Sequence, residues 1–193
     1  SAGTWAVLFD DTLSTPREYL VLTAAAARTA DGIARTTMPG LRTRPGGADL
    51  IIVTHALFRS EAERLAAHRA ARTGMRVAVV DVQDIYDEFN YGHLSSDPVK
   101  AFLKNAFTAW PAPAPAHVLM FGDASWDFHG FMASTIMKNY VPAYGVPAGD
   151  NWYVCYDPAY PFLPSMHIGR LPVQDPVQAA RVVDKVTGYD DAA

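Results

Sequence analysis

Two side chains, His129 and Cys155, are of the types that form a nucleophilic pair. In such a pair the histidine removes the proton of the thiol, and the thiolate then attacks a carbonyl carbon. Their surroundings argue against this role. His129 follows Ser-Trp-Asp-Phe instead of a buried strand, and Cys155 lies in an alternating pattern between Val154 and Tyr156. A lone cysteine in such a pattern is more often a small core residue, so we expect the pair to be a decoy.

Two further pairs of residues end or interrupt apolar runs, and we predict structural roles for them at strand ends. Gly122 and Asp123 end one run. Asp123 could accept backbone hydrogen bonds from the loop that follows, or bind a cation together with Asp127. Gly169 and Arg170 interrupt another run, where the planar fork of an arginine can bind a carboxylate or carbonyl oxygens.

Several classes of function are disfavoured by composition and by the motifs that are missing. The 193 residues carry a net charge of −4 and no concentrated basic face, which argues against a nucleic-acid partner. No apolar run approaches the length of a membrane span. The chain has no HExxH, EF-hand or nucleotide-binding motif and no cysteine pair, so we predict no metal and no cofactor. Scattered aspartates leave a structural Ca²⁺ open.

The order of apolar runs and helix signals predicts an α/β fold from residue 48 onward. Strands are expected at 48–56, 75–82, 117–121 and 166–171, with a short strand or hairpin arm at 152–157. Helices are expected from Ser60, as the N-cap of a capping box with Glu63, to Gly74, and after Asp97-Pro98 and Asp175-Pro176. Residues 83–91 are expected to be irregular.

This alternation predicts a mainly parallel sheet with helices on both faces, a Rossmann-like arrangement. The strands at Ile51, Val79 and Leu119 should lie side by side and parallel, with Gly122-Asp123 at their common carboxyl edge. Residues 1–47 lack this rhythm. We expect them to form a short β-containing appendage, or the end of a preceding domain, with strands at 4–10 and 18–23.

The order of several motifs resembles the gingipain-type cysteine peptidases, which have a caspase-like fold of two side-by-side α/β halves. The motifs are VLMFGDASWD, NYVPAY, GDNWYVCYD, GRLPV and a helix that runs to KVTGY, and the resemblance covers about residues 48–190. It implies that the chain is the first, amino-terminal half of the catalytic module. In that family the catalytic histidine lies in a Gly-His-Gly-like turn and the cysteine follows it, both in the second half. No Gly-His-Gly occurs before Ala193, so we expect no catalytic residue within the chain.

The resemblance also implies a substrate-binding role for Asp150, and Trp152 and Tyr153 beside it are further candidates because aromatic residues with a polar group suit a cleft. In Arg-specific members an aspartate at the position of Asp150 lines the pocket for the residue before the scissile bond, where a carboxylate can bind a guanidinium. The alternative is that Asp150 only shapes a turn with Gly149. The loop aromatics Trp126, Tyr144, Trp152 and Tyr153 are candidates for the surface that meets the second half or for the neighbouring cleft. The alternative is that they pack into the core of this domain.

The resemblance implies that the chain is the non-nucleophile half of a secreted or cell-surface cysteine endopeptidase. Its partners would be the carboxy-terminal catalytic half of the same polypeptide and a peptide or protein substrate. The alternative is a non-catalytic binding or surface-assembly module that keeps the fold. A third possibility, a small-ligand binder, would need a deep pocket near His55, Asp81 and Gly122.

Overall fold

The computed structural model describes residues 35–132 and 137–192, together with Asp10, Leu22, Thr23, Ala25, Gly32 and Ser134. The chain divides into two units, residues 1–37 and 38–193, and the second is described here. The strands predicted at 4–10 and 18–23 lie almost wholly outside the described residues. The division that we predicted between residues 47 and 48 stays a prediction.

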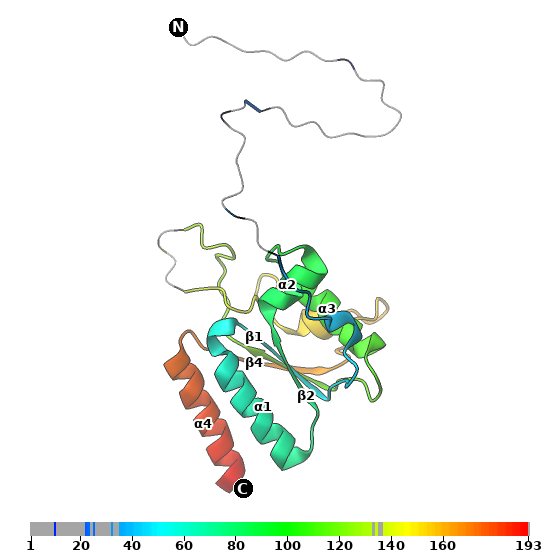
Figure 1. Ribbon diagram of the computed structural model, residues 1–193, viewed down its shortest axis with the longest axis vertical. Helices are drawn as coiled ribbons and strands as arrows, with labels where there is room; N and C mark the ends of the chain where they lie inside the picture. Colours follow the sequence, from blue (N-terminus) through cyan, green and yellow to red (C-terminus); the bar gives the residue numbers. More distant parts are fainter. Residues whose placement is uncertain are drawn as a thin grey trace. The chain divides into compact units, whose positions relative to one another are not determined.

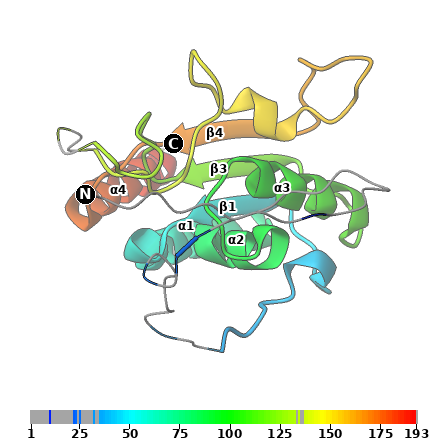
Figure 2. The same cartoon turned by 90° about the horizontal axis from the view of Figure 1, so that it is seen from above.

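A four-stranded parallel sheet is the centre of the second unit, in the order β2-β1-β3-β4 (Figures 1 and 2). The strands are β1 (Leu50–Thr54), β2 (Val77–Asp81), β3 (His117–Phe121) and β4 (His167–Leu171). Ile52 of β1 lies opposite Val79 on one side and Leu119 on the other. The predicted parallel arrangement of these three strands is confirmed. Every residue of β1 is buried because both neighbours and both faces are covered, which explains its continuous apolar run.

Helices cover both faces of the sheet, as predicted. Helices α1 (Arg59–Thr73) and α4 (Pro176–Ala192) pack on one face, where Leu65 and Val183 join a core with Ile52. Helices α2 (Val82–Asn90) and α3 (Asp97–Ala109) pack on the other face, where Phe102 joins a core with Ile51. Figure 2 shows the α1/α4 layer and the α2/α3 layer on opposite sides of the strands. No helix in the described part of the chain is long and apolar enough to cross a membrane.

The helix ends follow the predicted signals in part. Gly74 ends α1 in the left-handed conformation, and its N–H donates to the carbonyl oxygen of Ala70. Asp175 caps α4, since its carboxylate accepts the backbone N–H of Gln178. The predicted capping box at Ser60 is wrong. Helix α1 begins one residue earlier, at Arg59, and the carboxylate of Glu63 binds the Arg59 guanidinium instead.

Two local predictions are wrong. The segment expected to be irregular is helix α2, which begins directly after β2 because the Asp81 side chain accepts the Gln83 N–H. The hairpin arm expected at 152–157 is a short 3₁₀ helix, η4 (Asn151–Val154). A 3₁₀ turn buries the consecutive residues Tyr153 and Val154 together, whereas a strand would point them to opposite faces.

A second 3₁₀ turn, η2 (Leu41–Thr43), attaches the start of this unit to α2 and α3. The backbone N–H groups of Leu41 and Arg42 donate to the two carboxylate oxygens of Glu88, at 2.8 and 2.9 Å. The indole N–H of Trp110 donates to the Leu41 carbonyl at 2.8 Å. Residues 41–43 are therefore held by α2 and by the end of α3.

Candidate functional site

The carboxyl edge of β3 begins a long loop whose return is built by backbone hydrogen bonds. The N–H of Gly122 donates to the carbonyl oxygen of Leu171, the last residue of β4, and the N–H of Asp123 donates to that of Val173 just beyond it. The Asp123 carbonyl accepts from the N–H groups of Tyr140 and Val141. Gly122 has φ of +146°, and a Cβ atom there would lie 3.0 Å from Val141 Cγ2. The turn at this edge therefore requires glycine, because a side chain would both strain the backbone and collide with the returning loop.

Arg170 of β4 holds the returning loop through all five of its N–H donors. Its Nε and one terminal nitrogen bind the two oxygens of Asp150 at 2.8 and 2.6 Å, which is a bidentate pair. Its terminal nitrogens also donate to the carbonyl oxygens of Gly122 (2.8 Å), Val141 (2.6 Å) and Pro142 (3.0 Å). One buried guanidinium thus connects β3, β4 and both ends of residues 141–150.

Asp150, predicted to bind substrate, therefore already binds a guanidinium of its own chain. The side chains of Arg170 and Asp150 are only 13% and 19% exposed, so the pair is largely shielded from water. Each carboxylate oxygen still has lone pairs that Arg170 does not use. The structural role predicted for Arg170 rests on these contacts, and contact of Asp150 with substrate stays a prediction.

Of the two aromatic residues predicted to bind substrate, Tyr153 is in the core and Trp152 is at its border. Tyr153 is fully buried, and its hydroxyl donates to the Pro142 carbonyl at 2.7 Å. Burial raises the pKa of Tyr153 to about 12, so it acts as a neutral donor at this position. Trp152 stacks on Tyr144, with ring centroids 3.6 Å apart, and the ammonium of Lys100 lies 4.0 Å from the centroid of the Trp152 ring.

Two nearby tyrosines provide a matched test of buried hydroxyl groups. We expect Tyr153→Phe to lower the free energy of unfolding by about 1 kcal/mol, because the hydrogen bond to Pro142 is lost. The hydroxyl of Tyr156 is buried and has no hydrogen-bond partner among the described residues. We therefore expect Tyr156→Phe to be neutral or stabilising. Urea unfolding of the two variants measures the difference, and equal losses would contradict the assignment.

The carboxylates of Asp123 and Asp127 are used to order the loop. The two carboxylate oxygens of Asp123 accept hydrogen bonds from the backbone N–H of Ala124 and from the side-chain amide of Gln174, at 2.8 and 2.7 Å. Asp127 is 8% exposed and accepts the N–H groups of Phe131 and Met132 at 3.0 and 2.9 Å. These contacts support the structural role predicted for Asp123. In the part of the chain that the structure describes, no three His, Cys, Asp or Glu residues form a possible metal site.

His129 and Cys155 lie in different surroundings. His129 is exposed on the loop and stacks on Phe131, with ring centroids 5.1 Å apart. Cys155 is 5% exposed at the end of η4, where its thiol donates to the carbonyl of Asn151 at 3.2 Å. The two residues line different cavities, so the geometry supports the interpretation of the pair as a decoy.

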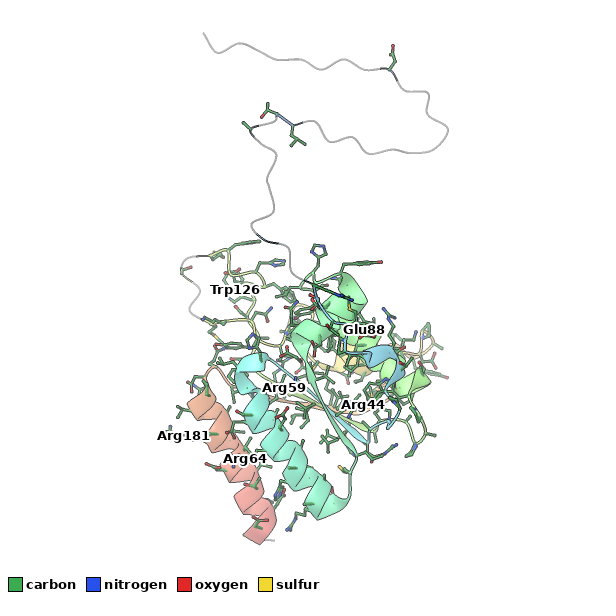
Figure 3. The ribbon with its side chains drawn as sticks, in the orientation of Figure 1. Arg44, Arg59, Arg64, Glu88, Trp126 and Arg181 are labelled. Atoms are coloured by element: carbon green, nitrogen blue, oxygen red, sulfur yellow. The ribbon has the colours of Figure 1, made fainter. Side chains whose placement is uncertain are left out.

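A cavity of about 370 Å³ opens at the carboxyl edge between the two limbs of the long loop. It is lined by Ser96, Ala124, Ser125, Trp126, Phe128, Ala143, Gly145, Val146 and Ala148. Trp126 is 77% exposed on the loop, away from the sheet (Figure 3). Sequence reasoning selected Trp126, and Tyr144 beside the cavity, but it missed the lining residues Ser96, Ala143, Gly145, Val146 and Ala148. Small residues without a reactive group cannot be recognised as site residues by their chemistry. A Pro- and Gly-rich turn beside aromatic residues would nevertheless have indicated a loop that could line a site.

The third possibility was a small-ligand pocket near His55, Asp81 and Gly122. The polar side chains there already bind groups of this chain. Nδ1 of His55 accepts the Leu57 N–H at 3.1 Å, and Asp81 caps α2. The candidate site is therefore the edge cavity with the Arg170–Asp150 pair behind it. Among the described residues, it brings together no nucleophile and base.

Comparison with known proteins agrees with this fold and gives the family. The crystal structure of dimeric latent PorU from Porphyromonas gingivalis shares the fold, with a TM-score of 0.61 and 24% sequence identity. The match covers 74% of this chain but only 15% of that protein, so the chain spans a small part of its length. No curated protein matches the chain significantly in sequence. Residues 43–193 match the family model of Peptidase family C25, and the chain therefore belongs to that family, the gingipain family.

Proposed function

We propose that the chain is the non-nucleophile half of a secreted or cell-surface gingipain-like cysteine endopeptidase. It supports a catalytic half of the same polypeptide and contributes part of the cleft that binds a peptide or protein substrate. The observation that carries the proposal is the cavity at the carboxyl edge, in a member of Peptidase family C25. Ligands of parallel α/β sheets bind at this edge, where the loops between strands and helices meet.

In this proposal the chemistry is divided between the two halves. A thiolate of the catalytic half attacks the peptide carbonyl, and a histidine transfers the proton to the leaving amine. The residues of this chain hold the substrate in place. Arg170 fixes residues 141–150 to the ends of β3 and β4, so that one wall of the cleft is rigid before substrate binds. A rigid wall reduces the entropy that is lost when the reacting groups are aligned.

The role of Asp150 in substrate selection takes a restricted form here. Because Arg170 occupies one side of the carboxylate, a substrate guanidinium would have to use the remaining lone pairs of Asp150. The principal contribution of Asp150 is then to anchor the wall of the cleft. Trp152 contributes its stacked ring with Tyr144, and Tyr153 holds Pro142 from within the core.

We expect the 193-residue chain alone to hydrolyse no peptide substrate and to resist labelling by thiol-directed peptidase inhibitors. The reason is that the thiol of Cys155 is buried and donates to the Asn151 carbonyl, while His129 is exposed and lines a different cavity. Turnover is measured with Arg- and Lys-type fluorogenic peptides, and labelling by mass spectrometry. Turnover that disappears in both Cys155→Ala and His129→Ala and persists in the control His68→Ala would overturn the proposal and assign the pair His129 and Cys155 a catalytic role.

A non-catalytic binding or surface-assembly module is the second candidate. The exposed apolar side chains of the loop, Trp126 at 77% and Phe131 at 84%, favour it, because such residues are typical of protein interfaces. The sequence that follows Ala193 in the natural protein discriminates between the two candidates. A Gly-His-Gly-like turn followed by a cysteine supports the peptidase, and their absence supports the binding module.

A further inference from the structure

A second cavity, of about 250 Å³, lies between helix α3 and the segment that contains η4. It is lined by Lys100, Lys104, Trp152, Cys155, Tyr156, Asp157, Pro158 and Pro161. The chain has few lysines, and two of them lie one helical turn apart on the face of α3 that borders this cavity. The cavity therefore combines two ammonium groups with aromatic and proline walls.

The two lysines have no ion-pair partner in the described part of the chain. The ammonium of Lys100 lies on one face of the Trp152 ring and is partly buried. Burial lowers the pKa of Lys100, because the charged form has lost part of its hydration. The neighbouring Cys155 acts in the opposite direction. Asp157 supplies one carboxylate at the rim, and one of its oxygens accepts the Ala159 N–H. Asp97, at the start of α3, also acts on Lys100 and favours its charged form, but Asp97 does not line the cavity. Among the residues that line the cavity, two ammonium groups face one carboxylate, so the lining has a net positive charge that an anionic group can neutralise.

A third cavity, of about 310 Å³, adjoins the second on the other side of Trp152. The two share Trp152, Cys155 and Pro161, and the third is walled mainly by apolar groups, including Tyr144 and Phe162. Residues 144–149 form a turn closed by the backbone pair Tyr144 and Gly149. One side of this turn borders the carboxyl-edge cavity, and the other side borders the third cavity. The edge cavity and the third cavity therefore lie on either side of this turn and share Gly145 and Val146 as lining residues.

We propose that these two cavities form an accessory site for a peptide segment that carries a carboxylate next to an apolar side chain. The carboxylate binds between Lys100 and Lys104, and the apolar side chain enters the cavity lined by Tyr144 and Phe162. That the occupant is a peptide rests on the proposed function. The site itself rests on the unneutralised lysines and on the apolar cavity beside them.

The chemistry of the walls favours this occupant over a bare anion. Proline and aromatic surfaces bind extended peptides, since flat rings pack against side chains and backbone with little loss of entropy. A bare anion would leave the apolar cavity empty. The carboxylate can come from a Glu or Asp side chain or from a peptide C-terminus, and the two sources place it differently relative to the apolar side chain.

The test is a calorimetric titration of the 193-residue chain with four probes. The first is a blocked heptapeptide that contains Phe-Pro-Glu. The second replaces its Glu by Gln, and the third is the Gln peptide with a free C-terminal carboxylate. The fourth is inorganic phosphate. We expect the Glu peptide to bind about tenfold more tightly than the Gln peptide, as expected when one charged hydrogen bond is lost. Tighter binding of the third peptide than of the first would assign the site to a C-terminus.

Matched variants locate the binding. Lys100→Gln and Lys104→Gln should each weaken binding of the Glu peptide about fivefold to tenfold. Lys185→Gln, on the exposed face of α4, should leave the affinity for this peptide unchanged. Equal binding of the three peptides, an equal loss in Lys185→Gln, or phosphate binding as tight as the best peptide would each overturn the proposal. These titrations need no turnover. Their failure leaves the peptidase proposal intact, whereas peptide hydrolysis by the chain alone would overturn that proposal and not this one.

Discussion

Replacing Arg170 by methionine is expected to lower the free energy of unfolding by about 3–5 kcal/mol, the largest loss we predict for a single side chain. The variant keeps a similar volume but leaves the largely buried carboxylate of Asp150 without its partner. It also removes the donors to the carbonyl oxygens of Gly122, Val141 and Pro142. Because domains are stable by only about 5–15 kcal/mol, the variant should unfold at a much lower urea concentration.

Arg64→Met is the matched control for this variant. Arg64 of α1 also binds carboxylates, those of Glu61 and Asp184, and it faces α4 in Figure 3. Its side chain is 41% exposed, so water and salt screen the pairs, and we expect a change below about 1 kcal/mol. Arg170→Lys should fall between the two, since it keeps the charge but cannot make the bidentate contact. An Arg170→Met midpoint equal to that of Arg64→Met would show that the buried contacts contribute nothing.

Gly122→Ala is expected to lower the free energy of unfolding by about 2–3 kcal/mol, because the new side chain strains the backbone and collides with the returning loop. The φ angle of +146° is rarely adopted by residues with a side chain, and the Cβ atom would lie 3.0 Å from Val141 Cγ2 and 3.2 Å from Tyr140 Cβ. Both neighbours belong to the loop that returns to Asp123. Relief of the collision would therefore move the loop that forms the carboxyl edge.

The control is Gly169→Ala in β4, where a Cβ atom would have no neighbour within 4 Å and φ is not positive. We expect the free energy of unfolding of this variant to be unchanged or to rise by up to about 1 kcal/mol, because alanine loses less conformational freedom than glycine on folding. Urea unfolding followed by circular dichroism compares the two variants. Similar midpoints for both would contradict the requirement for glycine at position 122.

The periodicity of the sequence was sufficient to predict the sheet. A strand buried on both faces is mostly apolar, as Leu50–Val53 of β1 are, and its one polar residue, Thr54, donates its hydroxyl to the Phe121 carbonyl. Glycine and aspartate mark helix ends by local backbone chemistry. Helix α2 was missed although its apolar residues Val82, Ile85, Tyr86 and Phe89 have helical spacing. The helix begins without a connecting loop, because Asp81 is both the last residue of β2 and the cap of α2.

The sequence by itself determined that the strands at Ile51, Val79 and Leu119 lie side by side and parallel, and it indicated the loop at the carboxyl edge that carries the candidate site. Only the structure showed that the fourth apolar run, β4, is partly exposed. Only the tertiary structure decided that Asp150 binds Arg170, that Tyr153 is in the core, and that Lys100 lies on Trp152. The physical reason is that burial depends on local periodicity, which any short window of sequence displays. Which two polar groups meet depends on the path of a long loop across the end of the sheet, and that path is set by contacts between residues far apart in the chain.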